Sequence, residues 1–103
     1  MKITVPYPII DMVKTGTNIQ RLREASGFTV AEVQHYLGLS NPQAIYHWQK
    51  GISLPTVDHL YALSILFGVS MNDVLVASDS PGPATIQTKK KPMMKPYLLL
   101  LAA

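Results

Sequence analysis

Stop signals recur through the middle of the chain and divide it into short pieces. Four stretches with apolar residues at helical spacing are each followed by a glycine, at Gly27, Gly38, Gly51 and Gly68. Glycine readily adopts the left-handed conformation that ends a helix, so each of these positions is expected just past a helix C-terminus. The chain between Thr17 and Ala77 is therefore predicted to form successive short helices.

Start signals complete the prediction of five helices. Thr29 and Glu32 have the spacing of a capping box, in which the two side chains satisfy free N–H groups at a helix start. Pro42 after Ser40 and Asn41 is typical of a first helical turn. The predicted helices span about residues 17–25, 29–37, 40–50, 56–67 and 70–76. Val57, Leu60, Leu63 and Phe67 are expected to form the buried face of the fourth.

The ends of the chain differ from this helical part. Lys2–Val5 alternates like a short strand until Pro6 stops it, and the stretch after Ala77 is rich in Pro, Gly and Ser. We expect four segments: an extended N-terminal lead-in over 1–13, a helical domain over 14–77, a flexible Pro/Gly/Ser and Lys-rich linker over 78–96, and an apolar C-terminal segment over 97–103.

Composition excludes several classes of function. A chain of 103 residues has the size of one domain, and its lack of cysteine excludes disulfides, thiolate zinc sites and cysteine nucleophiles. The three histidines, His35, His47 and His59, lie 12 residues apart, too far for two metal ligands on one helical face. No motif for phosphate binding, serine hydrolysis or zinc peptidase activity occurs. We expect neither an enzyme nor a metal or other cofactor, and no small-molecule ligand is evident.

No membrane or export signal is expected. Pro6, Pro8 and Asp11 interrupt any apolar stretch behind Lys2, so the N-terminus does not resemble a signal peptide. The apolar run that starts at Tyr97 is far shorter than the roughly 20 residues that span a bilayer. With the lack of cysteine, these features favour a cytoplasmic protein without membrane contacts.

The net charge of +3 is concentrated at one end. Residues 14–77 hold equal numbers of cations and anions, whereas residues 78–103 hold one aspartate and four lysines: Lys89, Lys90, Lys91 and Lys95. A basic tail on a neutral domain favours an arm for an anionic partner. A merely solubilising tail is an equally good interpretation.

The stretch from Phe28 to Gly51 carries the functional signal. A capping-box helix, Gly38, a short turn and a second helix with Ile45 and Trp48 form the pattern of a helix-turn-helix, whose second helix can enter a DNA major groove. Together with Leu54–Thr56 and Phe67–Leu75, this pattern resembles the Cro/repressor (XRE-like) helix-turn-helix family from about Asn18 to Val76. The resemblance implies an all-α fold: a compact five-helix Cro/repressor-like helix-turn-helix domain, to which short terminal strands can be added.

Three features depart from the family pattern. Val30 stands where members usually carry a phosphate-contacting Gln. Gln49 stands where members carry a Glu paired with an Arg, here Arg23, so the ion pair becomes a charge-assisted hydrogen bond. The interval from Gly38 to Gly51 is one residue longer than usual, which lengthens the turn near Asn41.

The resemblance and the helical periodicity together assign roles to individual residues. Side chains opposite the buried stripe of the third helix are expected to contact bases: Gln43, Ala44, Tyr46 and His47. Phosphate contacts are assigned to Thr29, Ser40, Asn41, Lys50, Lys89, Lys90 and Lys91. The structural core of the motif comprises Val33, Leu37, Gly38, Ile45 and Trp48, braced by Arg23 and Gln49. Without the resemblance, the polar face of this helix is an ordinary solvated surface.

Two functions remain open at this stage. The favoured one is sequence-specific binding of double-stranded DNA by a homodimeric, repressor-like transcription regulator. The alternative is a protein-interaction or antitoxin-like module that keeps the fold without strong DNA binding, which the neutral domain and Val30 favour. Lys2–Val5 and Tyr97–Leu101 have no evident place among five helices and are candidates for strand pairing within or between chains.

Overall fold

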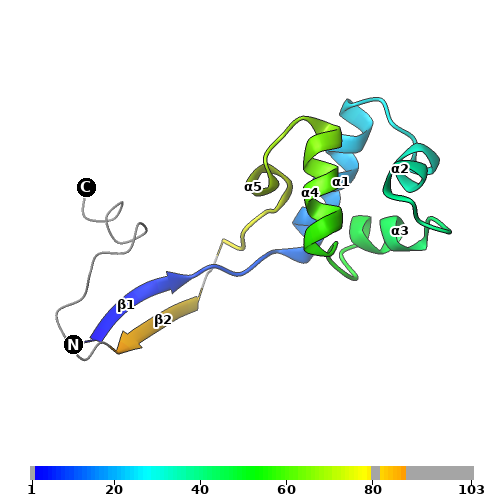
Figure 1. Cartoon of the computed structure of the whole chain (residues 1–103). Helices are drawn as coiled ribbons and strands as arrows, with labels where there is room; N and C mark the ends of the chain where they lie inside the picture. Colours follow the sequence, from blue (N-terminus) through cyan, green and yellow to red (C-terminus); the bar gives the residue numbers. More distant parts are fainter. Residues whose placement is uncertain (1, 80–81, 88–103) are drawn as a thin grey trace. The chain divides into compact units, whose positions relative to one another are not determined.

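The computed structural model describes residues 2–79 and 82–87 (Figure 1). The chain divides into a helical unit, Pro8–Ser80, and a terminal unit that contains both strands. The elements in chain order are β1 (Lys2–Tyr7), α1 (Met12–Ala25), α2 (Val30–Leu37), α3 (Gln43–Gln49), α4 (Val57–Phe67), α5 (Met71–Val74) and β2 (Gly82–Gln87). The prediction of a five-helix domain is confirmed, and so is the expected strand near the N-terminus.

Local sequence signals explain most helix ends. Thr29 and Glu32 form the capping box at the start of α2, and Thr56 caps α4 by accepting from the His59 N–H. Gly38 and Gly68 follow α2 and α4 with φ of 71° and 70°. This left-handed conformation is costly for other residues, which is why glycine ends both helices.

Three predicted helix bounds are wrong. α1 begins at Met12 instead of Thr17, inside the expected lead-in, because the Asp11 carboxylate accepts the Lys14 N–H at 2.9 Å and caps the helix. α3 begins at Gln43 rather than near Ser40. α5 ends at Val74 because the next residue is already extended, with ψ of 142°.

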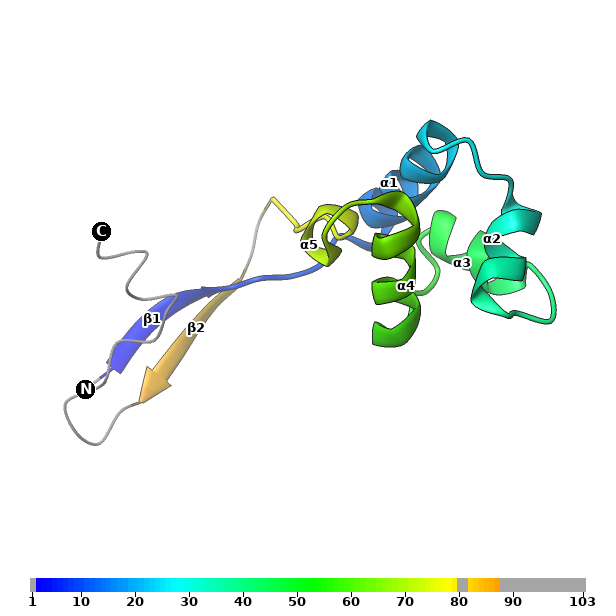
Figure 2. The ribbon, with the colours of Figure 1, turned by 45° about the horizontal axis from the view of Figure 1, so that its top comes forward.

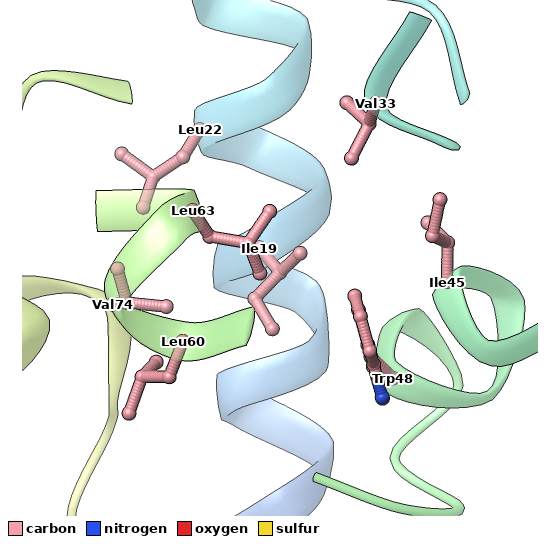
Figure 3. Packing of buried hydrophobic residues seen from close by; sticks show 8 residues of the cluster. All are labelled: Ile19, Leu22, Val33, Ile45, Trp48, Leu60, Leu63 and Val74. Carbon is pink, nitrogen blue, oxygen red and sulfur yellow. The ribbon is translucent and has the colours of Figure 1, made fainter. Parts of the chain in front are cut away.

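The core lies where all five helices meet. Ile19 of α1 lies between side chains of α2 and α3 and side chains of α4 and α5 (Figure 3). The buried apolar cluster consists of Ile19, Leu22, Val33, Ile45, Trp48, Leu60, Leu63 and Val74. Leu37 is half-buried and packs against this cluster. Val57, expected on the buried face of α4, is 72% exposed, so that expectation is wrong.

α1 and α3 approach each other more closely than a side chain would allow. A Cβ atom placed on Gly16 would lie 2.2 Å from the carbonyl oxygen of Trp48 and 2.8 Å from that of Gln49. Glycine weakens a helix interior, so its presence in α1 reflects this contact. Only glycine at this position lets the end of α3 rest against α1.

Side chains of α1 also hold the segment that follows α4. The Thr15 hydroxyl accepts the Val76 N–H at 2.9 Å, and the Asn18 amide donates to the carbonyls of Asp73 and Val74 at 2.8 and 2.9 Å. Lys14 pairs with Asp79 at 2.9 Å. The hydrogen bond and the charge of Asp79 raise the pKa of Lys14. α5, only four residues long, is thus fixed by the first turns of α1.

The two strands pair with each other. β1 and β2 are antiparallel, with Lys2 opposite Gln87, Pro6 opposite Pro83 and Tyr7 opposite Gly82. The flexible linker expected over 78–96 is therefore wrong for residues 82–87. The Pro and Gly residues at the start of this stretch concealed the alternation of Ala84–Gln87, which a partner strand stabilises. The expected pairing of Tyr97–Leu101 and the tail lysines lie outside the described residues.

Candidate nucleic-acid interface

A short turn joins α2 to α3, and the two helices lie next to each other in both views (Figures 1 and 2). The Asn41 side chain accepts the Gln43 N–H at 2.9 Å, which helps to start α3. The Gln34 amide donates to the Leu39 carbonyl at 3.3 Å and supports the turn from the α2 side. Sequence reasoning missed Gln34, because nothing in the sequence shows where its amide points.

α3 has one buried and one outward side. Ile45 and Trp48 are buried in the core, as predicted from their spacing. The ring of Trp48 also packs against His59 of α4, with ring centroids 5.7 Å apart. Trp48 therefore serves packing, which anchors α3 from inside the domain.

The outward side of α3 presents the predicted reading residues. Gln43, Tyr46 and Lys50 are exposed, and His47 is half-buried. The Gln43 amide nitrogen lies 3.1 Å from Nε2 of His47, so the two side chains form one polar pair. Ala44 is half-buried and packs against the core, which leaves its methyl group less exposed than its neighbours. The face can offer hydrogen-bond donors and acceptors and one cation.

Arg23 braces the end of α3. Its Nε donates to Oε1 of Gln49 at 3.0 Å, and its Nη1 donates to the Phe28 carbonyl at 2.8 Å. The guanidinium also lies 3.6 Å from Glu24. The charge-assisted hydrogen bond expected between Arg23 and Gln49 is present, and together with the bond to Phe28 it makes Arg23 a link from α1 to α3 and to the loop before α2.

The residues assigned to phosphate contacts are exposed at the start of α2 and in the turn. The Thr29 hydroxyl accepts the Glu32 N–H at 3.1 Å and lies on the exposed start of α2. Ser40 and Asn41 are exposed between α2 and α3. The backbone and side-chain hydrogen bonds of Thr29 lower the pKa of Glu32, whose carboxylate is a negative charge beside these groups.

Neither a metal site nor a membrane-spanning helix finds support in the described part of the chain. Within residues 2–79 and 82–87, no three His, Asp or Glu side chains gather closely enough to hold a metal ion. None of the helices in these ranges has the length and apolar character needed to cross a membrane.

Comparisons with known proteins agree on the helical unit. A family model described as helix-turn-helix, of the XRE type, matches residues 19–74. Among solved structures, the restriction-modification controller protein C.AhdI from Aeromonas hydrophila is similar, with a TM-score of 0.56 and 19% identity. The similarity covers 62% of this chain and 96% of that one. At this identity it concerns the fold. No curated protein sequence matches this chain.

Proposed function

Because the chain belongs to the XRE-type helix-turn-helix family of DNA-binding transcription regulators, we propose that it recognises a specific sequence in double-stranded DNA with α3 in the major groove. The observation that carries this proposal is the division of α3 into two sides. Ile45 and Trp48 fix the helix to the core, while Gln43, Tyr46 and Lys50 remain exposed. A helix anchored in this way presents its polar side to a groove without changing shape.

Gln43 and His47 are proposed to read bases. A glutamine side chain can contact adenine through two hydrogen bonds in the major groove. The contact between the Gln43 amide and His47, at 3.1 Å, orients the glutamine before DNA arrives. Tyr46 lies on the same side and is proposed to contact an adjacent base, while half-buried Ala44 is left with at most a methyl contact.

Lys50 is proposed to bind phosphate together with Thr29, Ser40 and Asn41. These contacts hold the helix in register and carry no sequence information. Because Lys50 is the one cation among these four residues, few phosphates are neutralised and the salt dependence of binding should be shallow for the domain alone. If Lys89, Lys90 and Lys91 follow the DNA backbone, they would make the salt dependence of binding steeper.

A homodimer on a palindromic site is the proposed working form. One recognition helix reads only a short half-site, and two-fold symmetry places two such helices about 34 Å apart, one turn of DNA. Bound in this way, the protein would act like a repressor by occupying the site.

Selection of bound sequences from a random duplex library, followed by titration of variants, tests the proposal. Gln43→Ala should cost a factor of about ten or more on the selected site and relax preference at one base position. Lys50→Ala should weaken selected and random duplexes alike. Gln20→Ala is the matched control, because Gln20 is exposed on α1 and bonds to Glu24. An unchanged preference in the Gln43 variant would contradict the assignment of α3.

The alternative is a protein-interaction module of antitoxin-like character. The observation that favours it is the negative charge of Glu32 at the start of α2, next to Thr29 and to Val30, where the family carries a phosphate-contacting Gln. Absence of salt-sensitive retention on duplex DNA at low ionic strength would support this alternative over DNA binding.

A further inference from the structure

A depression in the surface lies between α2 and α4, and we call it the α2–α4 depression. Its volume of about 440 Å³ falls within the range of about 300–1,000 Å³ that small-molecule sites occupy. It is lined by Phe28, Ala31, Glu32, His35, Tyr36 and Leu66. None of these residues belongs to the contacts assigned to DNA. Sequence reasoning found no small-molecule site, because Leu66 reaches this surface from a different helix.

The spacing of residues along α2 explains why the surface is hollowed here. Glu32 and Tyr36 lie four residues apart and form one row on α2, next to Ala31. Ala31 has only a methyl group, so a hollow remains where a larger residue would fill the surface. Phe28 and Leu66 are half-buried and pack against the core, which makes the inner part of the depression apolar and fixed.

The chemistry of the lining favours a cation with an apolar body. Phe28 and Tyr36 supply two aromatic rings, whose faces attract cations. Glu32 supplies the one carboxylate, and no lysine or arginine lines the depression. Its Oε1 accepts the Thr29 N–H at 2.9 Å, and among the described residues its Oε2 has no hydrogen-bond donor. An anionic ligand would be repelled by this carboxylate, and a neutral ligand would leave it unused.

We propose that the α2–α4 depression binds a small organic cation, with its charged group beside Glu32 and its apolar part against Phe28 and Leu66, and that this ligand favours DNA binding. The first part goes beyond the proposed function and needs no DNA. The second part rests on the proposed function, in which Thr29 contacts phosphate. A cation beside Glu32 offsets a negative charge next to that contact, so the occupied protein repels the DNA backbone less.

The exposure of the lining limits the strength of binding. Ala31, Glu32, His35 and Tyr36 are all exposed, so a bound ligand keeps one side in water. A small ligand that is only partly enclosed is expected to have a dissociation constant of millimolar order. Exposed contacts of a cation with aromatic rings and with one carboxylate are individually weak, and together they should favour a cation at least about fivefold over a neutral molecule of the same shape.

Choline and its uncharged isostere 3,3-dimethylbutan-1-ol are a matched pair of probes, because they share a shape and differ in charge. In NMR titrations of the full-length chain without DNA, choline should have a dissociation constant at least about fivefold lower than that of the alcohol. The amide signals that shift most should belong to residues 28–36 and to Leu66. Equal affinity for the two probes, no binding of choline, or shifts centred elsewhere would overturn the first part of the proposal.

Three variants locate the site. Glu32→Gln should abolish the difference between the probes and keep the start of α2, because glutamine also completes a capping box. Ala31→Leu should fill the depression and weaken choline binding at least about fivefold without changing any charge. Glu24→Gln is the matched control, since Glu24 is an exposed glutamate on α1, and it should bind choline as the parent protein does. Unchanged binding in the Ala31→Leu variant, or equal losses in the two glutamate variants, would overturn the site.

The effect on DNA binding is measured separately. Choline chloride should raise the affinity for the selected duplex about twofold or more over sodium chloride at the same concentration, in the parent protein and not in the Glu32→Gln variant. Equal affinity in the two salts would overturn the second part of the proposal while the ligand site stands. A protein that binds no duplex would contradict the proposed function and this second part with it, whereas the titration without DNA still decides the first.

Discussion

The contact between α1 and α3 and the outer side of α4 differ in how tightly they are packed. At Gly16 the backbones of α1 and α3 come so close that a single Cβ atom would overlap a carbonyl oxygen. Along α4, the large apolar side chains of Val57, Tyr61 and Ile65 have room around them. The first contact positions the helix that is proposed to read DNA, and its geometry leaves no freedom. The second region adds little to the fold.

The largest effect is expected where the two backbones meet. Gly16→Ala should destabilise the domain by about 3 kcal/mol or more, because the new methyl group meets backbone oxygens that cannot rotate away. Gly27→Ala is the control: nothing lies within 4 Å of its Cβ position, and only the positive φ of 79° opposes the change. It should cost about 1 kcal/mol. Urea denaturation measures both values, and equal values would show that α1 and α3 can move apart.

A smaller effect is expected at the brace between the same helices. Arg23→Ala should cost about 2 kcal/mol, because it leaves the Phe28 carbonyl and the Gln49 amide without their charged donor. Gln49→Glu should raise the unfolding free energy by up to about 1 kcal/mol, because it turns the hydrogen bond into a half-buried ion pair. Thermal unfolding of the two single variants and the double variant shows how much of the Gln49→Glu effect depends on Arg23.

The smallest effect is expected on the outer side of α4. Tyr61→Ser should change the unfolding free energy of the monomer by no more than about 0.5 kcal/mol, because the side chain makes few contacts within one copy. Leu63→Ala, two residues further along α4 and fully buried, should cost about 2–5 kcal/mol. Measurements at low protein concentration keep dimer formation out of both values. A large loss in the Tyr61 variant would assign the outer side of α4 to the fold itself.

Predictions from sequence succeeded where the signal is local. The capping box of α2 is formed by Thr29 and Glu32, and the end of that helix is fixed by Gly38. The buried side of α3 follows from the spacing of Ile45 and Trp48. Each of these signals lies within a few residues of chain. The bond between Arg23 and Gln49 spans 26 residues and was expected only because the family pattern pairs these two positions.

Predictions failed where distant parts of the chain decide the outcome. Gly16 is explained by the end of α3, and Asn18 caps α5 more than fifty residues away. Residues 82–87 form a strand because β1 pairs with them, although their own composition is typical of a loop. The exposure of Val57 follows from where α4 packs, which the apolar pattern of that helix leaves open, since it is apolar on more than one side.

The opposed prolines of the two-stranded sheet affect whether a strand of another molecule can pair with its edges. Opposed residues of an antiparallel ladder alternate between pairs that exchange two hydrogen bonds and pairs whose backbone N–H groups point outward. Pro6 and Pro83 face each other and have no N–H, so they fit only the second kind of pair. At this level neither edge of the sheet can donate to an incoming strand. Each edge therefore lacks one of the donors that an incoming strand would pair with, which weakens strand addition at this end of the sheet.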